Sequence, residues 1–459
     1  MIVSSRKASS SKSLAETMTY IGVDIGTTRT KAVLYSPEHD EVLASISTRT
    51  PSCHNGVATA RDPEAVTTVT EKLIRELLER RSVDRDGVVA LSIASIGEEV
   101  VVVDDHFRPI CPVIPWFDLR GREFASALAF RDHGGIGRID PSFSVFKLLW
   151  LRSQGVDFRG RYVTDLADYV LAAMGGVSAS ELSMDWSHAS RTGVFLPESR
   201  SWNTALLSAL GFGELALPRH TPSATVIGRI ASDVARRTSL PVSTALVSGG
   251  HDHFCGAFAC GVRADGDAFI SAGTSESLIV VLADPPAERV PFDFGCYVDG
   301  QHFYGHSALP AGRLFATWQQ LLYGDASLEE IWRDVDTISV GGTSRLELSP
   351  DRQTISLTDM PVEVTRAEIM HAVLQGVATA SANELKLMER VLHRLIRHIR
   401  AAGPATQTIT WRRVREAALG RELQVVDAGE EAALGAALLG LKATAAGRDG
   451  TSTQSTVIH

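Results

Sequence analysis

The stretch TYIGVDIGTTRTKAVLY, residues Thr19–Tyr35, decides the fold. It contains an apolar run at Tyr20–Val23, a turn-like segment at Asp24–Thr28 and a second apolar run at Lys31–Tyr35. Two short apolar runs that flank a glycine-containing turn predict a pair of strands joined by a tight loop. We therefore expect a β-hairpin with Gly26–Thr28 at its tip.

The same pattern returns in the second half of the chain, in DAFISAGTSESLIVVL, residues Asp267–Leu282. Asp267–Ser271 and Leu278–Leu282 are strand-like, and Ala272–Ser275 forms the turn between them. A dinucleotide-binding glycine loop would instead lead from a strand into a helix. Two hairpins with Gly-Thr-hydroxyl tips predict an internal duplication whose tips face each other across a cleft.

Length and charge limit the classes of protein that fit. A chain of 459 residues is too long for a single hydrophobic core and predicts two domains. A net charge of -9 argues against a nucleic-acid or anionic-membrane partner, because an acidic surface repels both. No apolar run approaches transmembrane length. The five cysteines show no C-x-x-C spacing and are expected to be reduced thiols, which favours a cytoplasmic protein.

The domain division is predicted near Pro241–Gly250, where the βα series of the first half ends. We expect an N-terminal domain at 19–245 and a C-terminal domain at 246–446. The Ser/Lys-rich residues 1–18 are expected to be a disordered tail, or an extension ahead of a later start codon. The polar residues 447–459 are expected to be a flexible tail. A homodimer is a candidate assembly.

The hydroxyls and backbone amides of the two tips suit the binding of phosphate. Gly26 permits close backbone approach, and Thr27 and Thr28 offer hydroxyl and amide groups to phosphate oxygens. Asp24 ends the preceding strand and is a candidate ligand of Mg²⁺, directly or through water. This motif alone predicts a structural turn equally well, but its repetition favours phosphoryl transfer. The equivalent residues at the second tip are Gly273, Thr274 and Ser275.

A second informative stretch is VSGGHDHFCGA, residues Val247–Ala257. An apolar strand runs into the paired glycines Gly249–Gly250, and Asp252 follows at the start of a helix of small residues. A carboxylate in that place faces whatever occupies the cleft and can act as the base that activates an acceptor hydroxyl. The alternative is that Asp252 merely caps the helix, while His251 and His253 are solvated. A metal site made by all three is disfavoured, because three adjacent residues at a helix start cannot all point at one ion.

Three segments carry clear helix signals. Asp62 and Pro63 predict a helix start with an aspartate cap and a proline in the first turn. Thr365 and Glu368 form a capping box ahead of a periodic apolar pattern. Glu430–Leu439 is rich in alanine and glycine, which predicts a helix that approaches a neighbouring element closely.

These motifs together resemble the FGGY family of carbohydrate kinases, which share the fold of actin, hexokinase and the heat-shock ATPases. The resemblance runs from about Thr19 to Leu441. The two tips look like the family's two phosphate motifs, and Gly249–Asp252 matches the glycine-rich segment that carries the general base. The other matching segments are Ser144–Leu151, Ser183–Gly193, Ala311–Arg313 with Trp318, Gln375–Ala378 and Glu430–Leu439.

The resemblance implies roles for further residues. Gly97–Glu99 falls where side chains contact the sugar in these kinases, and Glu98 is the best match. Trp116 and Asp118 belong to a segment similar to the family's W-x-D-x-R, and a tryptophan face beside carboxylates suits a polyhydroxy ligand. The alternatives are an exposed charged turn at Glu98 and Glu99 and a core aromatic at Trp116. The remaining implied residues are His253 on the substrate side, Gly312 and Gly403 beside the nucleotide, and Asp252 as a second metal ligand.

Two segments depart from the family pattern. Where the family carries three glycines beside the adenosine, this chain has Gly403-Pro404-Ala405. Proline removes an N–H and fixes φ, and alanine adds a methyl group, so the close packing of backbone against the nucleotide is expected to be weakened. The stretch Leu346–Val364 is also shorter than usual.

The sequence is therefore expected to encode an α/β protein of two actin-like, ribonuclease H-like domains, with mixed sheets flanked by helices and the active site in the interdomain cleft. The expected reaction is the ATP- and Mg²⁺-dependent phosphorylation of a hydroxyl of a small sugar or polyol, a pentulose-like ketose or polyol being favoured. One alternative is a kinase relic that acts as a sugar-binding regulatory protein. Another is an ATPase module that drives a partner, which the absence of a substrate domain disfavours.

Overall fold

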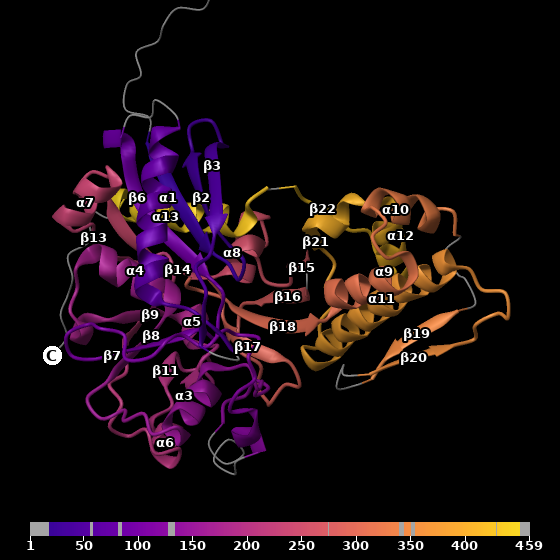
Figure 1. Ribbon diagram of the computed structural model, residues 1–459, viewed down its shortest axis with the longest axis horizontal. Coiled ribbons are helices and arrows are strands. Elements are labelled where there is room, and N and C mark those ends of the chain that lie inside the picture. The colour runs from indigo at the N-terminus through magenta and orange to yellow at the C-terminus, as the bar shows by residue number, and fades with distance from the viewer. Residues whose placement is uncertain are drawn as a thin grey trace, which may run out of the picture.

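The computed structural model of the chain describes residues 18–55, 58–80, 85–126, 134–273, 275–338, 344–349, 354–427 and 429–449. Most of both expected tails, and the predicted phosphate-binding residue Thr274, lie outside the described residues. The architecture is α/β, with two six-stranded mixed sheets in two lobes that lie side by side (Figure 1). The predicted fold class is confirmed.

The first sheet is built from strands of the N-terminal half. Its order is β13 (Val226–Arg229), β14 (Ala245–His251), β6 (Val88–Ser95), β1 (Thr19–Ile25), β2 (Arg29–Ser36) and β3 (Glu41–Arg49). The strands β1, β2 and β3 run antiparallel, whereas β6 is parallel to β1 and β14 is parallel to β6. The β1–β2 ladder runs from the Tyr20–Tyr35 pair to the Ile25–Thr30 pair, so the first predicted hairpin is confirmed.

The second sheet repeats this arrangement. Its order is β17 (Asp293–Cys296), β18 (Phe303–Leu309), β16 (Glu276–Leu282), β15 (Ala268–Ala272), β21 (Ile399–Ala402) and β22 (Gln424–Val425). The β15–β16 hairpin is antiparallel, and β18 pairs antiparallel with β16 on one side of it. On the other side, β21 pairs parallel with β15, and β22 pairs parallel with β21. The strands β18, β16, β15, β21 and β22 therefore repeat the order and directions of β3, β2, β1, β6 and β14. This repeat is the predicted duplication.

Helices cover both faces of the first sheet. One face carries α1 (Pro63–Glu79), α4 (Leu166–Gly175) and α7 (Ser232–Thr238), and the other carries α8 (Asp252–Ala259) and α13 (Glu431–Asp449). Successive side chains of a strand point to opposite faces. Ile21 and Val23 of β1 accordingly join the apolar cluster of α1 and α4, whereas Tyr20 joins the cluster of α13.

The helices α8 and α13 also pack against the second sheet. One apolar cluster contains Phe254 of α8, Ala436 of α13, Ala94 of β6 and Phe269 of β15. The two helices therefore lie between the sheets and connect the halves. β14 starts at Ala245 and continues the first sheet to His251, and α13 returns the chain to that sheet. The division of domains at residues 245 and 246 stays a prediction.

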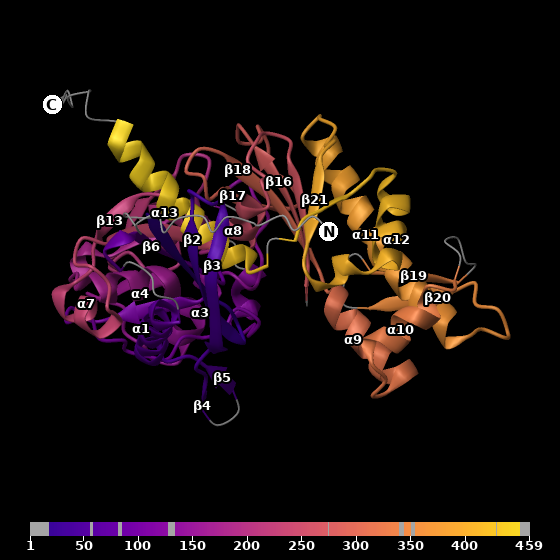
Figure 2. The ribbon, with the colours of Figure 1, turned by 90° about the horizontal axis from the view of Figure 1, so that it is seen from above.

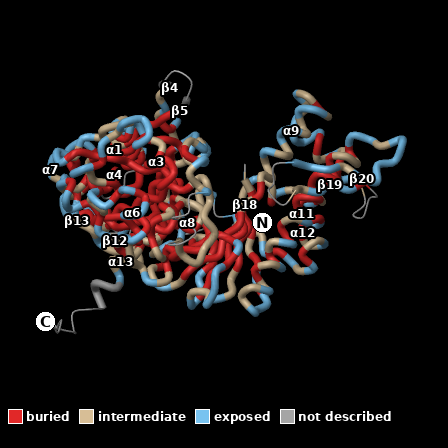
Figure 3. Tube along the Cα trace, turned by 90° about the horizontal axis from the view of Figure 1, so that it is seen from below, coloured by how far each residue is buried: buried red, intermediate tan, exposed pale blue. Residues whose placement is uncertain are grey.

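The second lobe extends away from this junction. Its sheet is covered by α11 (Arg366–Val391) and α12 (Ile409–Leu419), beside which lie α9 (Ala311–Tyr323), α10 (Leu328–Val335) and the hairpin β19 (Arg345–Leu348) and β20 (Ile355–Thr358) (Figure 2). Most residues of α9 are exposed or half-buried (Figure 3). None of the helices in the described ranges combines the length and apolar character that a bilayer span requires.

The shorter elements complete the first lobe and the connections. The strands are β4 (Cys53–Asn55), β5 (Ala58–Ala60), β7 (Val100–Val103), β8 (Tyr162–Asp165), β9 (Ser183–Asp185), β10 (Phe195–Leu196), β11 (Ser201–Trp202) and β12 (Arg219–Thr221). The helices are α3 (Ser144–Ser153), α5 (Trp186–Ala189), α6 (Thr204–Ala209) and the 3₁₀ turns η1 (Arg85–Gly87), η2 (Arg122–Ser126), η3 (Ala179–Glu181) and η4 (Pro404–Gln407).

The predicted helix starts are confirmed. Asp62 Oδ1 accepts hydrogen bonds from the backbone N–H groups of Glu64 (2.9 Å) and Ala65 (3.3 Å), with Pro63 in the first turn of α1. At the start of α11, Thr365 Oγ1 accepts from Glu368 N (3.2 Å) and Glu368 Oε2 accepts from Thr365 N (2.7 Å). Side chains thus satisfy backbone donors that a helix end leaves unpaired.

The predicted close approach of the alanine- and glycine-rich helix is also confirmed. A Cβ at Gly22 of β1 would lie 1.8 Å from the carbonyl oxygen of Ala433, and a Cβ at Gly435 would lie 2.0 Å from that of Cys255 on α8. Backbone therefore touches backbone on both sides of α13. This helix can occupy the space between β1 and α8 only because glycine stands at both contacts.

Replacing Gly435 by alanine should destabilise the protein by about 1–3 kcal/mol, the usual cost of forcing an extra methyl group into a filled interior. The matched control is Gly440→Ala on the same helix, where the new Cβ would lie 3.5 Å from its nearest neighbour. The control should be neutral, or stabilise by up to about 1 kcal/mol through better helix propensity. Urea-unfolding midpoints measure both, and equal effects would contradict the close packing of α13.

Candidate active site

Asp252 is the first residue of α8 and directly follows β14. The helix cap is His251, so the alternative in which Asp252 is the cap is wrong. Asp252 Oδ1 lies 2.8 Å from His251 Nδ1 and accepts a hydrogen bond from His253 N at 2.6 Å. His251 is 5% exposed, so the same alternative is also wrong in describing His251 as solvated. The strand end and the helix start together fix the direction of the carboxylate.

The Asp252 carboxyl is held in its ionised form. Burial by itself raises its pKa, but the charge of His253 and the hydrogen bond from His251 lower the pKa well below the usual range. An ionised carboxylate can only accept hydrogen bonds. It is therefore suited to orient a hydroxyl and to take its proton as the oxygen forms a new bond.

Asp252 borders a cavity of about 170 Å³ at the junction of the two halves. Its walls come from α8, from β15 and β21 of the second sheet, and from the start of α13. The lining residues are Asp252, His253, Gly256, Phe269, Ser271, Ala402, Gly403, Glu431 and Ala432. The structure thus brings together three predicted site residues, Asp252, His253 and Gly403, beside the strand that leads to the second tip.

Gly403 keeps a tight backbone contact despite the residues that follow it. Its φ is +110°, and a Cβ there would lie 2.6 Å from the carbonyl oxygen of Ala272 at the end of β15. Pro404 opens the 3₁₀ turn η4, where a missing N–H leaves no hydrogen bond unmade. Only glycine suits position 403, and the backbone there stays close to the second tip.

Asp24 lies next to the end of β1, opposite Lys31 in the hairpin. It is 9% exposed and its Oδ1 has no hydrogen-bond partner among the described residues. Burial, together with the charge of Asp252, raises its pKa to about 8. Lys31 lowers this pKa, but its ammonium group also pairs with Glu430 at 2.6 Å.

This arrangement fits a divalent cation. The charges of Asp252 and Glu431 both oppose the ionisation of Asp24, and an unpaired buried oxygen of Asp24 is available to a ligand. Carboxylate oxygens are the ligands that Mg²⁺ takes in proteins, together with water and phosphate oxygens. Asp24 and Asp252 are the residues that would hold the ion, with Glu431 on the cavity wall beside them.

Arg61, which no sequence motif had predicted, holds the backbone of the first tip in place. Arg61 donates from both terminal nitrogens to the carbonyl oxygen of Thr27 (3.2 Å each) and from Nε to Glu99 Oε2 (2.6 Å). Thr50 Oγ1 donates to the carbonyl oxygen of Gly26 at 2.8 Å. The side chains of Thr27 and Thr28 stay exposed at the tip. No motif marks a single arginine ahead of a helix, so only the fold reveals it.

Glu98 and Glu99 are buried, at 5% and 1% exposure, so the alternative of an exposed charged turn is wrong. Glu98 has a left-handed backbone, with φ +65°, and accepts a hydrogen bond from Arg191 Nε at 2.5 Å. Arg191 also pairs with Asp293 Oδ2 at 3.0 Å. Burial raises the pKa of Glu98, but Arg191, His251 and Lys147 together lower it below its usual value. Arg191 is a second residue that sequence reasoning missed.

Trp116 and Asp118 lie on the same side as Glu98 and Glu99. Trp116 is half-buried, so the alternative of a core aromatic is wrong. Its backbone N–H donates to Glu99 Oε1 (3.4 Å), and its indole Nε1 donates to Thr27 Oγ1 (3.1 Å). Asp118 accepts from Arg120 Nε at 2.9 Å. The predicted substrate side and the first phosphate tip are therefore in direct contact.

Lys147 is a fully buried ammonium group behind these carboxylates. Burial lowers its pKa to about 8, against the opposing charges of Glu98, Glu99 and Asp118. Its Nζ donates to the carbonyl oxygen of Ser142. Lys147 thus supplies positive charge within a group of carboxylates, which reduces their mutual repulsion.

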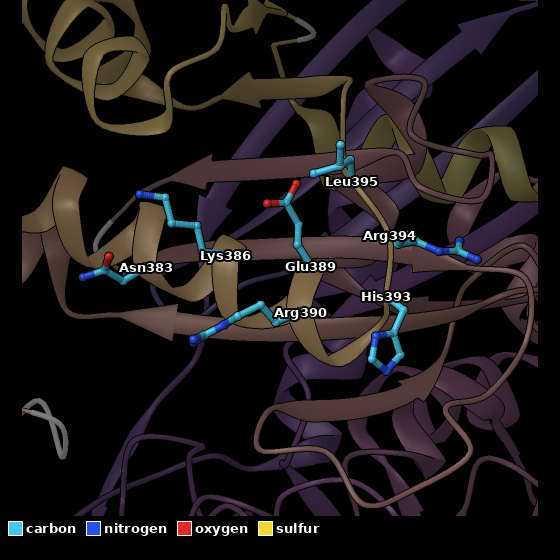
Figure 4. A pocket seen from close by; sticks show the side chains of 7 residues that line it. All are labelled: Asn383, Lys386, Glu389, Arg390, His393, Arg394 and Leu395. Carbon is cyan, nitrogen blue, oxygen red and sulfur yellow. The ribbon is translucent and has the colours of Figure 1, made fainter.

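The structure does not bring every predicted residue to the cavity. Gly312 lies in the first turn of α9 and is not among the residues that line the cavity. At the second tip, Gly273 N donates to the carbonyl oxygen of Ser275 at 3.2 Å, and Thr274 between them is not described. A larger open hollow of about 680 Å³ is formed by Asn383, Lys386, Glu389, Arg390, His393, Arg394 and Leu395 at the end of α11 (Figure 4). It contains none of the predicted residues.

A buried cluster of Asp165, Asp168, Asp185 and His188 could by composition hold a metal. Its own histidine supplies the positive charge. His188 Nδ1 hydrogen-bonds Asp185 and lies 3.5 Å from Asp165 Oδ2, while Nε2 contacts the carbonyl oxygen of Ser95 at 3.2 Å. Burial alone lowers the pKa of His188, but Asp165 and Asp185 raise it to about 10. A histidinium therefore occupies the centre of this cluster.

Two segments of the chain match a known family. Residues 19–259 match the N-terminal domain, and residues 342–444 the C-terminal domain, of the FGGY family of carbohydrate kinases. The chain is 24% identical to a xylulose kinase of Staphylococcus epidermidis, over 91% of this chain and 86% of that protein. It is 21% identical to a gluconokinase of Bacillus subtilis, over 92% and 87%. The solved structure of a "xyloylose kinase" from Brucella ovis matches with a TM-score of 0.84 at 21% identity, covering 93% and 91%.

The fold and the junction cavity define a two-lobed enzyme of the actin-like type. The chain belongs to the FGGY family of carbohydrate kinases. The predicted resemblance and the predicted class of enzyme are thus confirmed, and the family implies ATP and a divalent metal as cofactors.

Replacing His188 by glutamine should remove a pH-dependent part of the stability. The pKa of His188 is about 10 in the folded protein and 6.5 in the unfolded chain. Between pH 6.5 and about pH 10 the folded protein therefore keeps a proton that the unfolded chain has lost. This stabilisation is complete below a pH of about 6.5 and is lost as the pH rises through about 10. The difference in urea midpoint between wild type and variant should therefore shrink over that range.

The control is His106→Gln, whose side chain is 69% exposed. Its difference from wild type should stay small at every pH. If the His188→Gln difference is also independent of pH, the cluster does not contain a buried histidinium.

Proposed function

We propose that this enzyme transfers the γ-phosphoryl group of ATP to a hydroxyl of a small neutral sugar or polyol, with a pentulose-like ketose or polyol as the favoured acceptor. The observation that supports this most is the ionised Asp252, at a cavity between the two halves that is also lined by β15, the strand that leads to the second tip. Phosphoryl transfer depends mainly on positioning and on charge stabilisation, and this junction offers both.

Each group has a distinct role in the proposed reaction. Asp252 orients the acceptor hydroxyl and receives its proton as the phosphoryl group is transferred. The amides and hydroxyls of the tips, Gly26–Thr28 and Gly273–Ser275, bind phosphate oxygens. A Mg²⁺ ion held near Asp24 would neutralise charge on the phosphates. Gly403 and Gly312 are proposed to lie beside the nucleotide.

The acceptor class follows from the charges on the proposed sugar side. Every carboxylate there has its own cationic partner: Glu98 has Arg191, Glu99 has Arg61 and Asp118 has Arg120. Among the residues that the structure describes there, Arg61, Arg120 and Arg191 are each paired in this way, so none of the three is free to bind the carboxylate of a sugar acid. Paired carboxylates still offer oxygen atoms that accept hydrogen bonds from hydroxyls. We therefore favour a neutral acceptor that contacts Glu98, Trp116, Asp118 and His253.

The alternative of a kinase relic has no support from the comparisons, because the relatives named above are kinases. The ATPase alternative is also less suited to a site with paired carboxylates on its acceptor side. We place the reaction in the cytoplasm, since the five cysteines are free thiols that suit a reducing compartment. A homodimer, and the absence of nucleic-acid or membrane partners, stay predictions.

A panel of acceptors tests the proposal most directly. Xylulose, L-fuculose, simple polyols and gluconate should be offered with ATP and Mg²⁺, and ADP release measured in a coupled assay. We expect turnover with a ketose or polyol and little with gluconate. Preference for gluconate would contradict the neutral-acceptor argument, and sugar-independent ADP release would favour the ATPase alternative. Sugar binding without any turnover would favour the relic.

Asp252→Asn should cut turnover by about 10²–10⁴-fold, the usual worth of a positioned base. Asparagine keeps the shape of the side chain, so folding and ATP binding, measured by thermal unfolding and calorimetry, should stay close to wild type. The control is Asp105→Asn, whose side chain is 70% exposed. If Asp252→Asn retained near-normal turnover, Asp252 would not be the base.

A further inference from the structure

The ring of His251 lies between the proposed base and the proposed sugar side. Its Nδ1 is 2.8 Å from Asp252 Oδ1, whereas its Nε2 is 4.0 Å from Glu98 Oε2, too far for a hydrogen bond. The His253 N–H could compete for Nδ1, but it lies closer to Asp252 Oδ1 (2.6 Å) than to His251 Nδ1 (3.3 Å). A ring nitrogen 2.8 Å from a carboxylate oxygen needs a proton between the two atoms, so we assign the proton to Nδ1. In this tautomer the His253 N–H donates to Asp252 Oδ1 and not to His251 Nδ1.

A chain of hydrogen bonds fixes the backbone of His251. Its N–H donates to Ser187 Oγ at 2.9 Å, and the Ser187 hydroxyl donates to Asp185 Oδ1 at 2.5 Å. Asp185 is in turn bound by His188 and by the hydroxyl of Ser223, at 3.0 Å. The end of β14, which carries His251 and directly precedes Asp252, is thus attached to the buried cluster that contains His188.

Two glycines make room for this arrangement. A Cβ at Gly97 would lie 2.5 Å from His251 Cδ2, and a Cβ at Gly250 would lie 2.8 Å from Ser187 Oγ. The ring also packs on Phe254, with centroids 4.8 Å apart. The ring of His251 therefore has a defined place, which steric contacts and hydrogen bonds determine together.

We propose that His251 is a positioning residue for this reaction: its Nδ1–H holds the Asp252 carboxylate in the direction that meets the acceptor hydroxyl. The Ser187–Asp185 pair holds His251 in turn. This proposal rests on the proposed role of Asp252. A carboxylate without this hydrogen bond would be free to rotate, and a misplacement of about 1 Å can cost on the order of 10²-fold in rate.

Two substitutions of His251 separate its two ring nitrogens. In His251→Asn the amide nitrogen lies near the position of Nδ1, and in His251→Gln it lies near the position of Nε2. We expect His251→Asn to keep kcat within about threefold of wild type, and His251→Gln to lose about 10–100-fold. The KM values for ATP and for the accepted sugar should change by less than about twofold in both, because positioning of the base affects the transition state rather than ground-state binding.

The double variant Asp252→Asn/His251→Gln tests whether His251 acts through Asp252. If it does, His251→Gln should lower the residual turnover of Asp252→Asn by less than about twofold, the behaviour of two residues in one interaction. Additive losses would overturn the proposal. So would equal losses in His251→Asn and His251→Gln, or a normal kcat in His251→Gln while Asp252→Asn is inactive. If Asp252→Asn itself is active, the proposed function fails at its base, whatever His251 does.

A second pair of variants keeps the test independent of the stability of the His251 variants. Ser187→Ala removes the hydroxyl that binds His251 N, whereas Ser223→Ala removes the other hydroxyl on Asp185 Oδ1 and does not touch His251. Ser187→Ala should lower kcat by at least about fivefold at unchanged KM, and Ser223→Ala should stay within about twofold. Equal effects of the two would show that the cluster acts on stability alone and would overturn the proposal.

Discussion

The rest of the site depends on one constraint: an ionised carboxylate, Asp252, has to remain between a buried strand and the helix that follows it, on the wall of a cavity. Burial opposes the charge of Asp252, so the fold must supply compensating groups. It does so with His251 and with the N–H of His253, both of which belong to the same strand-to-helix turn. Because β14 lies in the first sheet and α8 between the sheets, this turn is at the place where the two halves meet.

The duplication explains why the other groups gather at the same place. Each half contributes a hairpin whose tip offers amides and hydroxyls, and α13 returns from the C-terminal half to place Glu431 on the wall of the cavity that Asp252 borders. The carboxylates around this junction differ in whether they have a cationic partner. The carboxylates on the proposed acceptor side are paired with arginines, whereas Asp24 keeps an unpaired buried oxygen. That difference separates a side suited to neutral hydroxyls from a side suited to a cation and phosphates.

Local patterns predicted most of the fold. The short apolar runs on either side of the glycine turns predicted both hairpins, and Asp62 and Thr365 marked helix starts correctly. The arginines that hold the site were not predictable in this way, because Arg61 and Arg191 find their carboxylates 38 and 93 positions along the chain. Spacing along a sequence carries no information about such pairs. The burial of His251 was not predictable either, because burial at a strand end depends on which elements the fold packs around it.

The central claim is that Asp252 activates an acceptor hydroxyl at the junction of the two halves. A crystal structure with an accepted sugar and a non-hydrolysable ATP analogue measures this directly. We expect one sugar hydroxyl within about 2.6–3.2 Å of an Asp252 carboxylate oxygen, on the side that faces the γ-phosphorus. A sugar bound with every hydroxyl beyond reach of Asp252, or with the γ-phosphate directed away from it, would show that Asp252 is not the base.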